Sequence, residues 1–372
     1  MHIYGKITGI KYTPLFALPS LKEVVFDGFD VNNVPRSCIV KDGNYTFAVS
    51  RWVSPKRTRS YPFERVYDTL NVAKKITVIP VVKDEGINGD RDYIQWDTVS
   101  LMSLLDVFVI FAHYDKAEIN KRNPKKLKIT NQQFNNEFIK TKIKEIEQYH
   151  SSALHWNLNE LKTKLHFIVD CAADAYRKIE KITGIKLHDK TGIENFKNKI
   201  GNDISIFMNF SRDKSKQAQA REIVTIQPKE SLQTLSKATI TIENYLGGQY
   251  FLTADEIKTN NKELHIIESK HSKNSRLPSI GDIKDGLLKM ILFSNMSNVS
   301  VDGQSVKYKA ILALTSPKIK GQVYSSDTKN NINSFILKNK FNTKQSRIIT
   351  NIFEEATKNN FIVQIQFSQN DD

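Results

Sequence analysis

The feature that most restricts the fold of this chain is a run of β-branched and apolar residues, KKITVIPVV, at residues 74–82. A run of this kind is typical of a strand buried inside a sheet. YIQWDTVSLMSLL (93–105) follows with apolar residues at helical spacing, and VFVIFAHY (107–114) returns to a strand pattern. Short alternating runs between turn residues make residues 1–60 rich in predicted strands. We therefore predict an N-terminal α/β domain over residues 1–115.

Residues 116–200 have a different character. They begin with a polar, lysine-rich stretch, and between residues 133 and 183 apolar side chains recur every three and four positions. This spacing predicts two or three helices, and Gly184 is a suitable residue to end the last of them. We expect residues 116–200 to form a lysine-rich helical region.

Helix and strand patterns alternate from residue 201 to residue 372. We predict a helix over 228–246, although the β-branched ATITIE stretch makes its second half uncertain. Two strands joined by a polar turn follow. The remaining predictions are a helix within 277–296, a strand at 306–315, a helix at 343–360 and a strand at 361–367. The fold class is thus α/β with a mixed sheet.

Composition narrows the partner and the compartment. The 372 residues carry a formal charge of +15, which favours an anionic partner such as nucleic acid, although a lysine-rich surface can also serve solubility. Cys38 and Cys171 are far apart in sequence and form no metal-binding pair. Two isolated thiols of this kind are typical of a protein in a reducing compartment. No signal peptide is visible, and the apolar run at 99–114 is interrupted by Asp106. We expect a cytoplasmic protein with no membrane partner.

The hairpin at residues 252–272 contains three charged residues that we expect to converge. Glu268 and Lys270 share one face of their strand, and pairing across the turn places Asp255 near residues 266–268. Two carboxylates can bind Mg²⁺, which polarises a phosphodiester and acidifies a water molecule. A lysine can orient the water and offset transition-state charge. The alternative is a solvated ion pair on a surface hairpin.

Asp255 followed by the triplet Glu268-Ser269-Lys270 resembles the PD-(D/E)xK nuclease superfamily, and type II restriction endonucleases within it. The resemblance implies a restriction-endonuclease-like αβββαβ core in residues 201–372, with Asp255 and Glu268 as metal ligands and Lys270 as the catalytic lysine. Ala254 replaces the proline of the family motif. Many such enzymes use a further acidic residue from the preceding helix. Glu243 is our first candidate for this residue, and Glu222 is the second.

Two basic segments are candidates for contacts with DNA. HSKNSRLPS follows the triplet, and its His271, Lys273 and Arg276 can grip phosphates; the alternative is a basic loop without a ligand. RWVSPKRTRSYPFERVY (51–67) interleaves basic and aromatic residues. Arg51, Arg57 and Arg59 are its candidate DNA contacts, unless this is a solvated loop whose aromatic residues belong to the core.

An acidic loop at residues 83–97 follows the buried strand. A metal site is conceivable there, but no lysine has the spacing of a hydrolytic site, and the loop lacks the EF-hand pattern. Helix capping and ion pairs with Lys83 and Arg91 are the structural alternative.

Other catalytic signatures are missing from the sequence. It contains neither a P-loop nor a methyltransferase-type motif nor a cysteine-rich finger. We therefore expect a Mg²⁺-dependent, sequence-specific endonuclease for double-stranded DNA in a restriction-modification system, leaving 5′-phosphate and 3′-hydroxyl ends. We further expect a homodimer in which residues 1–115 serve DNA recognition or dimerisation, and a cognate DNA methyltransferase that acts separately. The alternatives are a structure-selective or repair nuclease of the same fold, and a non-catalytic nucleic-acid-binding module.

Overall fold

The protein divides into two compact units, which we describe separately. One unit comprises Met1–Pro19 and Asp213–Asp372, and the other comprises Ser20–Arg212. The predicted regions are therefore grouped differently: residues 116–200 share a unit with residues 20–115, and the first residues of the chain join the C-terminal part. The computed structural model describes residues 1–16, 20–55, 61–122, 125, 127–200, 205–209, 213, 216, 238–244, 249–260 and 263–368.

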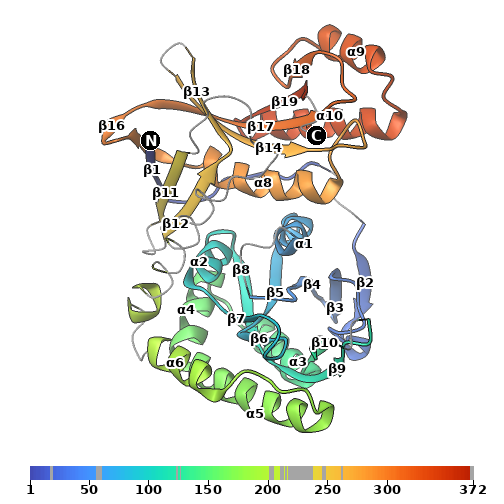
Figure 1. Ribbon diagram of the computed structural model, residues 1–372. Coiled ribbons are helices and arrows are strands. Elements are labelled where there is room, and N and C mark those ends of the chain that lie inside the picture. Colours follow the sequence, from blue (N-terminus) through green and yellow to red (C-terminus); the bar gives the residue numbers. More distant parts are fainter. Residues whose placement is uncertain are drawn as a thin grey trace. The chain divides into compact units, whose positions relative to one another are not determined.

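The Ser20–Arg212 unit contains a five-stranded sheet in the order β2-β3-β4-β5-β8 (Figure 1). Its last three strands are parallel, and β8 is buried along its whole length although it lies at the edge of the sheet, because α2, α3 and α4 pack against it. Two further pairs, β6 with β7 and β9 with β10, are antiparallel. The strands of this unit are β2 (Lys22–Val25), β3 (Ser37–Asp42), β4 (Tyr45–Arg51), β5 (Lys74–Pro80), β6 (Val82–Asp84), β7 (Arg91–Tyr93), β8 (Val107–Ala112), β9 (Tyr114–Ile119) and β10 (Ile129–Phe134).

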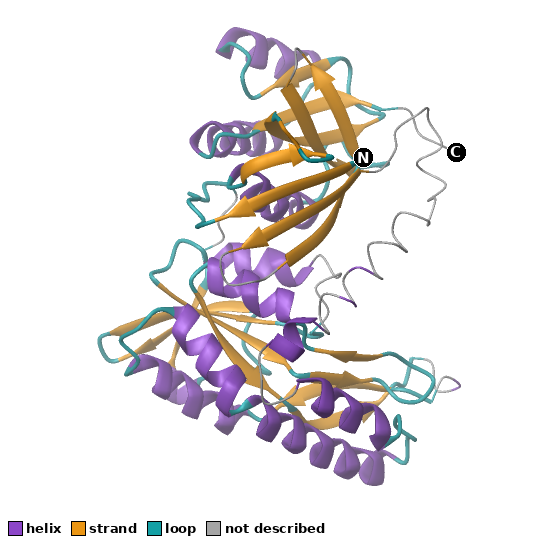
Figure 2. Cartoon of the chain, turned by 90° about the vertical axis from the view of Figure 1, so that its left-hand side faces the viewer, coloured by secondary structure: helices purple, strands orange, loops and turns teal. Residues whose placement is uncertain are grey.

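Helices flank the strands of this unit (Figure 2). The longest, α5, buries apolar residues at three- and four-residue spacing and ends at Gly184, whose φ of 64° is left-handed. This confirms the predicted helices between residues 133 and 183 and their stop. The helices are α1 (Tyr61–Thr69), α2 (Trp96–Leu104), α3 (Asn136–Glu147), α4 (Ala153–Thr163), α5 (Leu165–Thr183) and α6 (Lys190–Ile200), with a 3-10 turn at Phe26–Gly28.

The other unit is built on two five-stranded sheets, ordered β12-β11-β1-β15-β16 and β13-β14-β17-β19-β18. In the second sheet β14, β17 and β19 run parallel, with β13 and β18 antiparallel at its edges. The strands are β1 (His2–Ile7), β11 (Ala238–Asn244), β12 (Gln249–Ala254), β13 (Glu256–Asn260), β14 (Glu263–His271), β15 (Ser297–Val301), β16 (Gln304–Ser305), β17 (Lys307–Ser316), β18 (Gln322–Tyr324) and β19 (Ile362–Phe367).

Three described helices belong to this unit: α8 (Ile280–Ser294), α9 (Lys329–Lys338) and α10 (Thr343–Lys358). α8 connects β14 to the strands that follow and packs against both β14 and β17. Its N-terminus is capped by Ser279, whose hydroxyl accepts from the Asp282 backbone N–H, and α10 begins with a capping box at Asn342.

The predictions for residues 249–367 are largely confirmed, because the hairpin, α8, α10 and β19 fall within the predicted ranges and β17 extends one residue beyond its predicted end. The helix predicted over 228–246 is wrong for its second half, since Ala238–Asn244 forms β11. Four consecutive β-branched residues, at positions 239–242, favour a strand there. The first half, residues 228–237, lies outside the described residues.

Candidate active site

The hairpin is fixed by its register. Glu256 pairs with Ile267 across β13 and β14, and the chain bends at Asp255 between β12 and β13. β12 belongs to one sheet and β13 to the other, so Asp255 lies where the chain passes between them. The Asp255 backbone N–H donates to the Ile267 carbonyl at 3.1 Å. Asp255 therefore lies opposite Glu268, as the sequence predicts.

Side-chain contacts hold Asp255 against β14. Its Oδ2 accepts the Ser269 backbone N–H at 2.8 Å. The residue as a whole remains exposed, but its carboxyl is partly desolvated, and one of its oxygens is oriented by the strand that carries Glu268 and Lys270.

Glu268 is the buried centre of the cluster, with only 2% of its surface exposed. Its Oε1 lies 3.0 Å from the Lys270 Nζ, and its Oε2 lies 2.7 Å from the Nζ of Lys289 on α8. Lys270 also contacts Asp285 Oδ2 at 2.7 Å. A buried carboxylate needs such partners, because removing one partner of a buried ion pair destabilises the fold by about 3–5 kcal/mol.

The pKa values of the two expected metal ligands, Asp255 and Glu268, are shifted in opposite directions. Desolvation, and then the negative charge of Glu268, raises the pKa of Asp255 to about 6. Burial alone would raise the pKa of Glu268, but Lys289 and Lys270 outweigh it and lower that pKa. Glu268 is thus held ionised, and Asp255 carries the cost of a second negative charge beside it.

Lys270 is held as an ammonium. Burial would lower its pKa, but Glu268 and Asp285 outweigh burial and raise it. A lysine in this environment keeps its proton at neutral pH, so it suits charge compensation and orientation of a nucleophile better than proton abstraction.

The donor set fits one hard divalent cation. Asp255 and Glu268 repel each other, as the raised pKa of Asp255 shows, and a cation between them would remove that repulsion. No group of three or more His, Cys, Asp or Glu side chains arranged to hold a metal occurs within the part of the chain that the structure describes. Two carboxylates completed by water are sufficient for Mg²⁺.

The basic loop after β14 is bonded to the end of β17 and to the residues that follow it. The Ser316 hydroxyl donates to the Ser275 carbonyl at 2.7 Å, and Lys318 Nζ donates to the Asn274 carbonyl at 2.7 Å. Lys273 is exposed and Arg276 half-buried. Both remain available to an anion, since neither side chain has a partner among the described residues.

His271 differs from its two basic neighbours. Its Nδ1 lies 3.0 Å from the Thr315 hydroxyl and 3.1 Å from the Ser368 hydroxyl. These contacts engage it within its own unit, so the structure gives it less freedom to reach a phosphate than Lys273 or Arg276.

The structure does not bring Glu243 to the cluster. Ala238, at the start of β11, pairs with Ala254, whereas Glu243 lies near the other end of β11. At about 3.3 Å per residue, roughly 16 Å of strand separates them. Glu243 instead accepts a hydrogen bond from the Tyr4 hydroxyl, which raises the pKa of Tyr4 to about 12. Glu222 lies outside the described residues.

The segment at 51–67 is described only in part. Arg51 donates to the Val31 carbonyl, and burial lowers its pKa, so its guanidinium serves the interior of its unit. Trp52 is fully buried, which confirms the core alternative for that aromatic residue. Arg57 and Arg59 lie outside the described residues.

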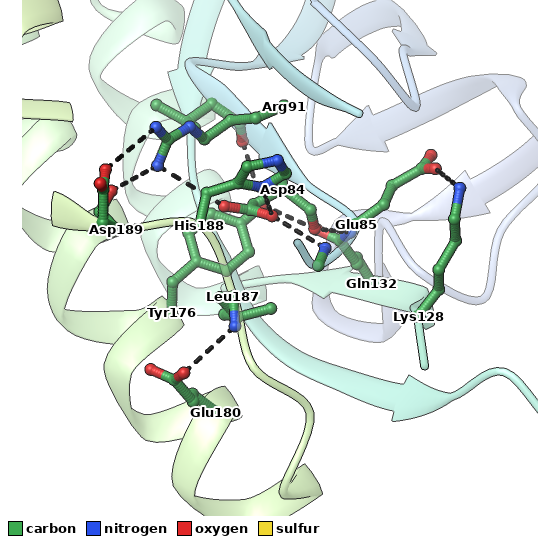
Figure 3. A network of polar contacts seen from close by, with 12 residues as sticks. Asp84, Glu85, Arg91, Lys128, Gln132, Tyr176, Glu180, Leu187, His188 and Asp189 are labelled. Atoms are coloured by element: carbon green, nitrogen blue, oxygen red, sulfur yellow. Dashed lines mark hydrogen bonds and ion pairs between the residues drawn. The ribbon is translucent and has the colours of Figure 1, made fainter. Parts of the chain in front are cut away.

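The acidic loop forms a separate polar network in the Ser20–Arg212 unit (Figure 3). Buried Asp84 lies 2.8 Å from His188 Nδ1 and 3.8 Å from the Arg91 guanidinium. Tyr176 OH donates to Gln132 Oε1 at 2.7 Å, and Gln132 Nε2 donates to the Asp84 carbonyl at 2.6 Å. The network joins β6, β7, β10 and α5, and it confirms the predicted Arg91 ion pair. These contacts hold the strands and the helix together, as the structural alternative for this loop predicts.

Sequence reasoning missed two members of the cluster, Asp285 and Lys289. They are four positions apart on α8 and face β14 together with Gly286. The available signal was a glycine and two opposite charges, four positions apart, within a helix rich in apolar residues.

Comparison with known proteins adds no assignment: no family model, curated protein or solved structure matches this chain. None of the described helices combines the length and apolar character needed to cross a bilayer.

Proposed function

We propose that the protein is a Mg²⁺-dependent endonuclease acting on double-stranded DNA, of the type II restriction class. The observation that carries the proposal is the meeting of Asp255, Glu268 and Lys270, in which Lys270 contacts Glu268 at 3.0 Å and Asp255 lies opposite Glu268 in the hairpin register. The order β11, β12–β13, β14, α8 and then the parallel β17 supports a core of the PD-(D/E)xK kind.

The residues divide the chemistry as follows. Asp255 and Glu268 would hold Mg²⁺, which supplies Lewis acidity and an acidified water when bound. Lys270 keeps its proton and stabilises negative charge that develops on the phosphate, while Asp285 and Glu268 fix its position. Lys273 and Arg276 hold the flanking phosphates. Hydrolysis would leave 5′-phosphate and 3′-hydroxyl ends.

A net charge of +15 supports a polyanionic substrate. We further propose a cytoplasmic homodimer, because a twofold target is matched by a twofold protein. Its companion would be a separate DNA methyltransferase.

The test is digestion of a long DNA of known sequence with purified protein, with and without Mg²⁺. We expect discrete fragments that require Mg²⁺, and a loss of about 100-fold or more in rate for Lys270→Ala with DNA binding retained. Lys258→Gln is the matched control, since Lys258 forms a surface pair with Glu256 on the same hairpin.

Other outcomes lead to other assignments. Cleavage confined to junctions or damaged sites would favour a structure-selective or repair nuclease. Binding without metal-dependent loss of any DNA substrate would favour a non-catalytic module. Normal cutting by Lys270→Ala would remove the site from consideration.

A further inference from the structure

Both carboxylate oxygens of Glu268 are already occupied by ammonium groups. Lys270 lies 3.0 Å from Oε1 and Lys289 lies 2.7 Å from Oε2. Glu268 is 2% exposed, so few other groups can reach it. A divalent cation bound by this carboxylate must therefore take the place of an ammonium or share an oxygen with one.

The two lysines are not equivalent in this exchange. Lys270 has a second acidic partner, Asp285 at 2.7 Å. Lys289 pairs with Glu268 alone among the residues that the structure describes. Losing Glu268 would leave Lys270 paired with Asp285, whereas Lys289 would keep only the longer-range attraction of Asp255.

The helix also allows Lys289 to move. Its side chain is 26% exposed, and it stands on α8 one turn after Asp285. A long lysine side chain can redirect its ammonium toward solvent while its stem stays against the helix.

We propose that the Lys289 ammonium occupies the cation position at Glu268 until a metal ion and a phosphodiester bind together. The Lys289 side chain then swings away from Glu268 and pairs with the phosphate. The inference rests on the proposed function. Since Lys289 and the metal compete for one oxygen, an anion that captures Lys289 must raise the affinity for metal, and metal must raise the affinity for the anion by the same factor.

Calorimetric titration of the full chain with Ca²⁺, in the absence of DNA, tests the competition directly. We expect Lys289→Gln to bind Ca²⁺ at least about tenfold more tightly than the unmodified protein, because a competing unit charge has been removed. Lys289→Arg, which keeps the charge, should bind like the unmodified protein. Lys309→Gln controls for net charge, because Lys309 lies on β17 and bonds to Asn360.

A second titration has an arm on the unmodified protein, and that arm does not depend on how Lys289→Gln folds. A short DNA duplex, checked by gel to be intact after the measurement, should raise the Ca²⁺ affinity of the unmodified protein about tenfold, and Lys289→Gln should lose most of this gain. Equal or weaker Ca²⁺ binding by Lys289→Gln, or no effect of the duplex on the unmodified protein, overturns the inference and leaves the nuclease proposal intact. Failure of every variant to bind Ca²⁺ and Mg²⁺ overturns both.

Discussion

At the scale of single residues, the site shows how position sets the charge state of two similar side chains. Glu268 is buried between Lys270 and Lys289, and these ammonium groups lower its pKa. Asp255 lies beside the same carboxylate with weaker compensation, and its pKa rises to about 6. One acid is thus a fixed anion, and the other becomes a favourable anion only when further positive charge arrives.

Asp255→Asn should make the metal-free protein more stable at pH 7.5. The folded protein binds a proton at Asp255 between about pH 4 and pH 6 that the unfolded chain has released, so its stability falls as the pH rises through this window. Asparagine removes that loss. Thermal unfolding in EDTA should show a higher Tm for the variant at pH 7.5, and a difference that disappears by pH 4.

Glu256→Gln is the control for this experiment, because Glu256 pairs with Lys258 at 2.6 Å and should give no gain. An Asp255→Asn variant that is less stable than the unmodified protein at pH 7.5 would contradict the assigned charge state.

At the scale of elements, α8 packs against β14 and adds Asp285 and Lys289 to the candidate site. Gly286 lets the helix approach β14 and β17 closely: a Cβ there would lie 2.6 Å from Leu312 Cδ1 and 3.3 Å from Lys270 Cε. The absence of this side chain gives the Lys270 stem room to run along the helix to Asp285. The helix thus contributes both charge and space.

Gly286→Ala should therefore destabilise the protein, although alanine normally favours a helix by about 1 kcal/mol over glycine. Overpacking against Leu312 should lower the free energy of unfolding by about 1–3 kcal/mol, measured in urea. Displacement of Lys270 should also slow Mg²⁺-dependent cleavage.

Gly9→Ala serves as the matched glycine substitution in the same unit, since nothing lies within 4 Å of a Cβ at that position. It should leave both quantities nearly unchanged. A stable, fully active Gly286→Ala variant would show that the close approach of α8 is unimportant.

At the scale of the whole molecule, the two ends of the chain build one unit. β1 pairs in parallel with β11 and antiparallel with β15, and Ile3 and Ile7 are fully buried. The N-terminal strand is therefore a structural part of the unit that carries the candidate site.

Ile3→Ala should consequently act far from its position in sequence. Loss of a buried isoleucine costs about 2–5 kcal/mol, and amide hydrogen exchange should accelerate in β11 and β15 while β5 and β8 stay protected. Ile79→Ala in β5 should give the reverse pattern. Equal acceleration in both units after Ile3→Ala would show that the units do not unfold separately.

Local patterns sufficed for much of the fold and for the centre of the site. Helical spacing and a terminal glycine predicted α5, and a polar turn between apolar runs predicted the β13–β14 hairpin. Because strand residues alternate faces and the turn sets the register, the convergence of Asp255, Glu268 and Lys270 followed from local information.

Local patterns were enough to predict the elements whose hydrophobic period is unambiguous and the convergence of three charged residues in one hairpin. Three features depended on the tertiary structure. β1 completes a sheet formed mainly by C-terminal strands, and Ala238–Asn244 is a strand that carries Glu243 away from the candidate site. On α8, Asp285, Gly286 and Lys289 face Lys270 and Glu268. These facts depend on contacts between segments distant in sequence, and local periodicity carries no information about which surfaces will meet.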